Sequence, residues 1–180
     1  MSGQIESGPY GNREPFGRIR GDRIRAIYSG EQISRLREQC QRPAPAIIVC
    51  DIYPKSGALP QELLYEVAAN ALAITVSGGH LEGVGSADGN APNGTGLEVR
   101  LMGEVGHAAA RQGLTFQDAN RLIQALLAKY ESVFDKPGGN PGQCIDKAYD
   151  LTKMAPVPEW QRMYDEVAEE LAELGLEIAR

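Results

Sequence analysis

The sequence has 180 residues, which suffices for one domain of ordinary size but falls below the roughly 200 residues that an eight-stranded α/β barrel requires. Apolar residues make up 42% and charged residues 23%, which argues against a disordered chain, and the net charge of −6 argues against a general nucleic-acid binder. No apolar stretch approaches the roughly 20 residues that span a membrane and no secretion signal is recognisable, so we expect a cytoplasmic protein that does not contact membranes.

The first 45 residues differ from the rest in charge. They hold eight arginines and five acidic residues, a balance of +3, whereas the remaining 135 residues carry 10 basic and 19 acidic side chains, a balance of −9. Residues 1–22 show no apolar period, and residues 23–40 favour one short helix. We interpret residues 1–45 as a basic, flexible leader of unknown relation to the rest, with phosphate contact as the alternative.

One segment has the composition of a short buried strand. Residues 46–50 (AIIVC) are apolar and rich in β-branched side chains, and Pro54 follows closely. A buried strand that carries polar side chains to its carboxyl end is a common way for α/β proteins to build a site. Cys50, Asp51 and Tyr53 are therefore candidate site residues. The alternative is an ordinary turn before Pro54.

The rest of the chain predicts amphipathic helices with clear boundary signals. Thr95 and Thr115 each begin a capping signature, and glycines follow the expected ends of the helices. The helices are expected over residues 60–77, 96–112, 115–134 and 159–174, with a short one over 144–151.

Two features of the second of these helices carry a structural prediction. Gly103 and Gly106 lie in its interior, where each costs roughly 1 kcal/mol relative to alanine, which predicts close packing against another element. Arg100 and Glu104 are spaced as an i,i+4 ion pair, and we expect this pair to be structural.

Residues 77–96 contain seven glycines, and we expect a long loop there, with a phosphate-binding loop as the alternative. This interpretation leaves one strand in the chain, from which no sheet can be assembled. The pattern thus predicts a mainly α-helical structure with one strand.

No motif in the sequence is specific for catalysis or metal binding. Cys40, Cys50 and Cys144 form no CxxC pair, so we expect them to be reduced and structural. His80 and His107 are too far apart in sequence for a zinc-binding helix motif. Two carboxylates on neighbouring elements, such as Asp51 and Glu104, could act as acid and base if they meet in space.

A series of short motifs resembles one family, the monomethylamine–corrinoid protein methyltransferases. Their order and spacing carry the resemblance from Tyr53 to the end of the chain. The motifs are Tyr53-Pro54 with Gly57, Glu66 with Ala68, Ser77-Gly78, Gly83-Val84, Ser86-Ala87 with Gly89, Thr95-Gly96-x-Glu98-x-Arg100-x-Met102-Gly103-Glu104-Val105, Tyr130-Glu131, Tyr149-Asp150, Pro156, Tyr164-Asp165 and Leu171-x-x-Leu174-Gly175-Leu176.

The resemblance implies a fold and an activity. Family members resemble eight-stranded α/β (TIM) barrels with an anionic cavity, and they transfer the methyl group of monomethylamine to the cobalt of a partner corrinoid protein. Their hallmark is pyrrolysine, which would lie upstream of the matched part. By this resemblance, residues 46–180 are the carboxyl-terminal third of such an enzyme, mainly helical and not a complete barrel.

The resemblance also implies site residues and partners. Tyr53 matches a tyrosine that the family places beside the pyrrolysine, and Asp51 stands where the family has a glutamine, so we expect both to bind substrate. No residue of this chain is expected to be catalytic, to bind a metal or to hold a cofactor directly, because the corrinoid is carried by the partner protein. We expect a homo-oligomer in the full-length family, and no transfer by this chain alone. The alternative is a non-catalytic helical module for protein interaction or oligomerisation.

Overall fold

The computed structural model describes residues 49–178. The predictions for residues 1–45, for the helix over 23–40 and for the first part of the strand therefore lie outside the described residues.

The described chain is mainly helical, as predicted. The elements are β1 (Val49–Ile52), α2 (Glu62–Val76), β2 (His80–Val84), η1 (Ala87–Gly89), α3 (Gly96–Gln112), α4 (Phe116–Tyr130), η2 (Glu131–Asp135), α5 (Ile145–Ala148), β3 (Tyr149–Asp150), β4 (Ala155–Pro156) and α6 (Pro158–Glu173). The four long helices are confirmed. The third is shorter than predicted, since α4 gives way to the 3₁₀ helix η2, and the predicted helix over 144–151 is confined to α5.

The prediction of a single strand and no sheet is wrong. The glycine-rich segment contains β2, which pairs in parallel with β1, and β3 pairs antiparallel with β4. The sequence of β2, HLEGV, has no apolar run of its own. Its conformation depends on hydrogen bonds to β1, which precedes α2 in the chain, and a local sequence pattern does not report such long-range pairing. The described residues still form no closed barrel.

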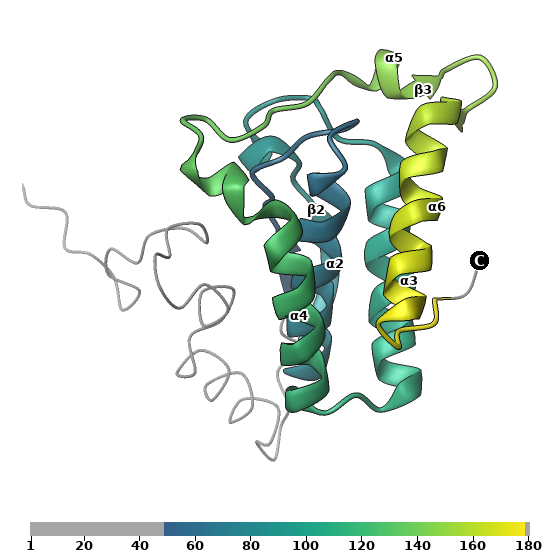
Figure 1. Cartoon of the computed structure of the whole chain (residues 1–180). Coiled ribbons are helices and arrows are strands. Elements are labelled where there is room, and N and C mark those ends of the chain that lie inside the picture. The colour runs from purple at the N-terminus through teal and green to yellow at the C-terminus, as the bar shows by residue number, and fades with distance from the viewer. Residues whose placement is uncertain (1–48, 179–180) are drawn as a thin grey trace, which may run out of the picture.

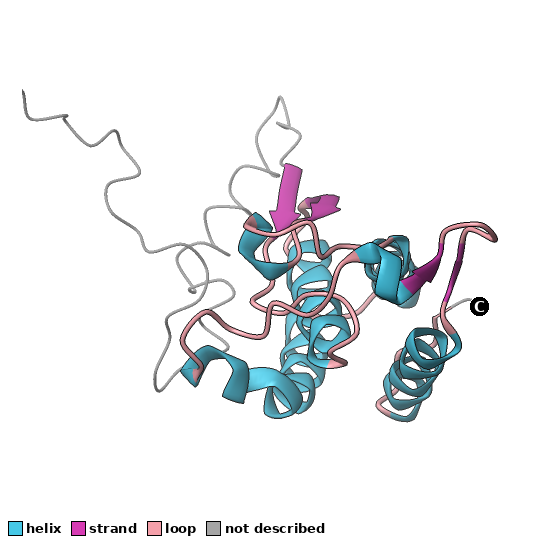
Figure 2. Ribbon diagram, turned by 90° about the horizontal axis from the view of Figure 1, so that it is seen from above, coloured by secondary structure: helices cyan, strands magenta, loops and turns pink. Residues whose placement is uncertain are grey.

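The elements form three layers, which Figures 1 and 2 show from two sides. The β1–β2 sheet lies behind α2 and α3, and α4 and α6 lie in front of them. α2 packs against both α3 and α4. One face of the parallel sheet is thus covered by helices, as in a β/α repeat.

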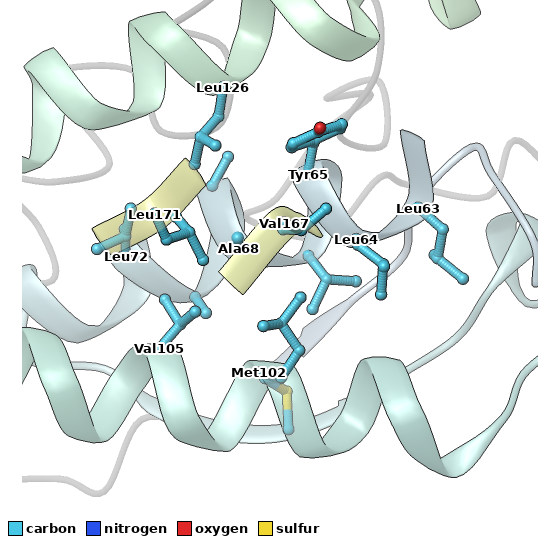
Figure 3. Packing of buried hydrophobic residues seen from close by; sticks show 14 of the residues in the cluster. Leu63, Leu64, Tyr65, Ala68, Leu72, Met102, Val105, Leu126, Val167 and Leu171 are labelled. Carbon is cyan, nitrogen blue, oxygen red and sulfur yellow. The ribbon is translucent and has the colours of Figure 1, made fainter. Parts of the chain in front are cut away.

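The core is built from apolar faces of four helices, and Figure 3 shows side chains from all four meeting. α2 contributes more of its surface than the others, since nearly all of its residues from 63 to 74 are buried. Trp160 and Tyr164 of α6 are also fully buried. The labelled side chains in this view are Leu63, Leu64, Tyr65, Ala68, Leu72, Met102, Val105, Leu126, Val167 and Leu171.

Both predicted capping boxes are present, at the start of α3 and of α4. The α3 box is buried and is joined to α6, because the Trp160 indole Nε1–H donates to Thr95 Oγ1 at 3.1 Å. Further along α3, Arg100 and Glu104 form the predicted ion pair at 2.7 Å. Tyr164 of α6 donates to Glu104, and the Arg100 guanidinium lies 5.1 Å from the centre of the Tyr164 ring. The pair therefore helps to hold α6 on α3.

The two glycines inside α3 differ. A Cβ atom at Gly106 would lie 2.4 Å from Leu81 Cδ1 of β2, so the predicted close packing is confirmed there. A Cβ atom at Gly103 would meet nothing within 4 Å, so the same prediction is wrong for Gly103.

Candidate functional site

The open face of the β1–β2 sheet carries Asp51, one of the predicted site residues, and Tyr53 follows at the end of β1. Cys50 pairs with Leu81 and Ile52 with Val84, so one residue of β1, Asp51, lies opposite two residues of β2. This bulge places Glu82 and Gly83 across from Asp51. Asp51 and Glu82 are exposed, on the face that α2 and α3 do not cover. The described part of this face is therefore acidic.

Tyr53 follows β1 and lies against two glycines. A Cβ atom at Gly85 would lie 2.5 Å from two carbons of the Tyr53 ring, and one at Gly89 would lie 3.1 Å from the nearest. The ring thus rests on backbone that carries no side chain. Its hydroxyl donates to Asp51 Oδ2 at 3.3 Å, and half of the residue is exposed. The negative charge of Asp51, with a smaller effect of Glu82, raises the pKa of the Tyr53 hydroxyl.

The loops that follow β1 and β2 are joined by backbone hydrogen bonds. Gly85 N donates to Ile52 O at 2.7 Å, Ala87 N to Ser56 O at 2.9 Å and Asp88 N to Pro54 O at 2.7 Å. Lys55 and Asp88 add an ion pair between the same loops. These contacts make one rigid rim at the carboxyl end of the sheet, where α/β proteins place their sites.

A third loop, which follows η2 in the chain, is hydrogen-bonded to the loop after β1. Gly57 N donates to Asn140 O at 2.8 Å, and Gln143 N donates to Ala58 O at 3.0 Å. A Cβ atom at Gly57 would lie 1.9 Å from Pro141 O, so only glycine fits at this crossing.

Two buried glutamates lie beneath the rim. Glu66 of α2 is 2% exposed and accepts hydrogen bonds from Lys55 N at 2.7 Å and Ser56 Oγ at 2.5 Å. Glu98 of α3 accepts from Thr95 and from Ser86 Oγ, the latter at 3.1 Å. Burial raises the pKa of both carboxyl groups, that of Glu66 to about 7, although the hydrogen bonds oppose this effect.

The structure brings some predicted site residues together and separates others. Asp51 and Tyr53 are in contact, as described above. Cys50 lies on the other face of β1, packed against the core, and burial raises the pKa of its thiol. Asp51 and Glu104 have different partners, since Asp51 bonds to Tyr53 whereas Glu104 bonds to Arg100 and Tyr164.

Sequence reasoning missed the roles of Glu66, Glu82 and Lys55. One signal for Glu66 was available, because it lies three residues after Leu63 on the apolar side of α2, where a charged residue is out of place. Glu82 gave no such signal, since its place depends on the unpredicted strand β2.

Within residues 49–178, no group of three or more His, Cys, Asp or Glu side chains gathers in a metal-binding arrangement. Over the same range no helix combines the length and apolar character needed to cross a bilayer.

This chain is similar in sequence to known proteins of one family. The family model for monomethylamine methyltransferase MtmB matches residues 45–176. Monomethylamine methyltransferase MtmB1 of Methanosarcina acetivorans is 33% identical over 126 residues, which are 69% of this chain and 27% of that protein. The Methanosarcina mazei enzyme MtmB gives the same identity and coverage. This chain therefore spans about a quarter of the length of the curated relatives it matches.

The fold gives a matching result. The crystal structure of the Methanosarcina barkeri monomethylamine methyltransferase superposes with a TM-score of 0.66 and 28% sequence identity, over 74% of this chain and 29% of that one. A crystal structure of the hydroxylamine MtmB complex gives the same values. The family match covers β1, β2 and all the helices described above. The chain belongs to the monomethylamine methyltransferase MtmB family.

Proposed function

We propose that this chain is the carboxyl-terminal portion of a methyltransferase that moves the methyl group of monomethylamine to the cobalt of a corrinoid protein. The observation that carries the proposal is the parallel β1–β2 pair, covered by helices on one face and acidic on the other. Two consecutive strands of a barrel have this arrangement, with the inward face lining the cavity. In the whole enzyme, cytoplasmic and oligomeric by this proposal, the open face would border the substrate.

The chemistry of the open face suits a small ammonium ion. Methylammonium carries three N–H donors and a positive charge, so it needs acceptors of negative or partial negative charge. Asp51 is an acceptor only, and the Tyr53 oxygen can both accept and donate. Glu82 adds a second negative charge on the same face. We therefore propose Asp51 and Tyr53 as substrate-binding residues.

The remaining parts of the reaction are assigned to other polypeptide segments. The corrinoid, which accepts the methyl group, is carried by a partner protein rather than by this chain. The group that activates the amine lies in the part of the family's enzymes to which this chain does not align. The role of this chain is to line the cavity, to hold its carboxyl-terminal rim and to cover the barrel with helices.

Complementation tests this proposal. The full chain is assayed for methyl transfer from monomethylamine to a corrinoid protein, alone and after co-expression with the segment of a Methanosarcina enzyme that precedes the aligned region. We expect no transfer by the chain alone, and both co-purification and transfer in the combined sample. Transfer by the chain alone, or failure of the two segments to associate, would contradict the proposal. In the active sample, Asp51→Asn should raise the KM for monomethylamine more than it lowers kcat.

One observation favours a second function, a non-catalytic helical module. Four helices bury a common core that includes Trp160 and Tyr164, as a module that folds by itself requires. Cooperative thermal unfolding, little binding of an apolar dye and no association with the complementary segment would together support this alternative.

A further inference from the structure

We infer that Glu66 is the positioning residue for Tyr53, acting through the loop that follows β1. This inference rests on the proposed function only in that Tyr53 is taken to be a substrate-binding residue. The contacts from which it is argued do not involve the substrate.

The first step is the contact between Glu66 and the loop. Its carboxylate accepts from Lys55 N at 2.7 Å and from Ser56 Oγ at 2.5 Å, and Ser56 N also donates to it. Three donors from two consecutive residues thus meet on one side chain of a rigid helix. Because Glu66 is 2% exposed, water does not replace these bonds when they break.

The second step carries this constraint to the next loop. Ser56 O accepts from Ala87 N, and Pro54 O accepts from Asp88 N. These hydrogen bonds attach the loop after β2 to the loop that Glu66 holds. Ala87 and Asp88 have φ values of 54° and 57°, a left-handed conformation that non-glycine residues adopt at a cost. The surrounding hydrogen bonds hold them there.

The third step reaches Tyr53. Gly85 and Gly89 flank these two residues, and both lie against the Tyr53 ring. A shift of the loop therefore moves the surface on which the ring rests, and with it the hydroxyl that bonds to Asp51. Tyr53 lies two residues before Lys55, so its own backbone is also restrained by Glu66. No other side chain of the described residues accepts hydrogen bonds from both Lys55 and Ser56.

The test reads the position of Tyr53 directly. The full chain is labelled with 3-fluorotyrosine, which gives a ¹⁹F signal for each of its seven tyrosines, and Tyr53→Phe identifies the signal of Tyr53. In Glu66→Ala we expect this signal to move toward that of free fluorotyrosine. Amide exchange over residues 53–58 and 85–90 should rise about tenfold or more, as loss of one buried hydrogen-bond acceptor implies.

A matched control separates positioning from general destabilisation. Val167→Ala removes buried side-chain volume from α6, so it lowers stability without touching the rim. It should leave the Tyr53 signal and the loop exchange unchanged. Glu66→Gln keeps one acceptor oxygen and should place the Tyr53 signal between those of the parent chain and Glu66→Ala.

Two other variants test the same contacts in case Glu66→Ala does not fold. If Glu66→Ala does not fold, Glu66→Gln carries the test together with Gly85→Ala, whose new methyl group must displace the Tyr53 ring while the bonds of Glu66 stay intact. A Tyr53 signal that stays in place in Glu66→Gln, or one that moves equally in Val167→Ala, would overturn the inference. Neither readout uses methylamine, so this outcome is distinct from failure of the complementation assay.

Discussion

Two glutamates, Glu66 and Glu98, are buried in successive helices, and each accepts hydrogen bonds from the loop that leads into its own helix. Burial of a carboxyl group is unfavourable for its charged form, and burial raises the pKa of both. In each of the two β/α units, a buried carboxylate thus holds the loop that precedes its own helix.

The raised pKa of Glu66 predicts a pH dependence of stability. Glu66 binds its proton more tightly in the folded state, with a pKa of about 7 against an unfolded value of 4.5. Its contribution to stability is therefore complete below pH 4.5 and is lost as the pH rises to 7, a change of about 3 kcal/mol. Glu66→Gln should remove this slope, so the free energies of unfolding of the two proteins, measured in urea, should diverge across this range. Parallel pH profiles would contradict the prediction.

The sequence indicated which candidate side chains meet only where the residues are close in the chain. Asp51 lies in β1 and Tyr53 directly follows it, two residues further on, so an extended backbone places both side chains on the same side. Glu82 joins them only through the pairing of β2 with β1, and Glu66 reaches Lys55 and Ser56 across the turn into α2. Contacts of these kinds depend on tertiary placement, which hydrophobic periodicity does not encode.

Among the elements, α3 and α4 begin with the same capping box in different surroundings. Thr115 is exposed, so Thr115→Ala should cost about 1 kcal/mol, as for an ordinary helix cap. Thr95 is buried and also accepts from Trp160, so Thr95→Ala leaves both the indole and Glu98 short of a partner and should cost about 3 kcal/mol. Urea unfolding of the two variants measures the difference, and equal losses would show that the buried contacts contribute nothing.

A second pair of matched substitutions lies inside α3. Gly103→Ala adds a methyl group to open space and should stabilise the chain by up to about 1 kcal/mol, the usual gain at a helix interior. Gly106→Ala pushes against Leu81 of β2, and the strain should outweigh that gain and leave the variant about 1 kcal/mol less stable. Thermal unfolding of both variants checks the sign of each change. Stabilisation by Gly106→Ala would mean that Leu81 repacks freely.

Helix elements were predictable because their signals are local. Thr95 and Thr115 mark the starts of α3 and α4 directly in the sequence, and Gly113 marks the end of α3. The strand β2 was not predictable, since two of its neighbours in sequence are glycines and its partner β1 precedes a whole helix. The end of α4 was misplaced because Val133 remains buried after the α-helix tightens into η2.

The described residues leave one face of their parallel sheet without a covering layer. The helices of this chain cover one face of a two-stranded parallel sheet, and such sheets are ordinarily covered on both faces. The TM-score of 0.66 against the Methanosarcina barkeri enzyme, over 29% of that protein, fits a piece of a larger architecture. Composition alone predicted a helix-rich domain. The barrel was implied only by the resemblance.

The lateral borders of the sheet have a practical consequence. Within residues 49–178, β1 and β2 pair only with each other, so each presents a row of backbone amide and carbonyl groups along its outer side. Such rows are templates for strands of other molecules, and half-exposed Val49 adds an apolar contact there. The acidic side chains of Asp51 and Glu82 oppose the close approach of a second copy. A chain that carries both Asp51→Asn and Glu82→Gln should therefore aggregate more readily than the parent chain, which light scattering measures.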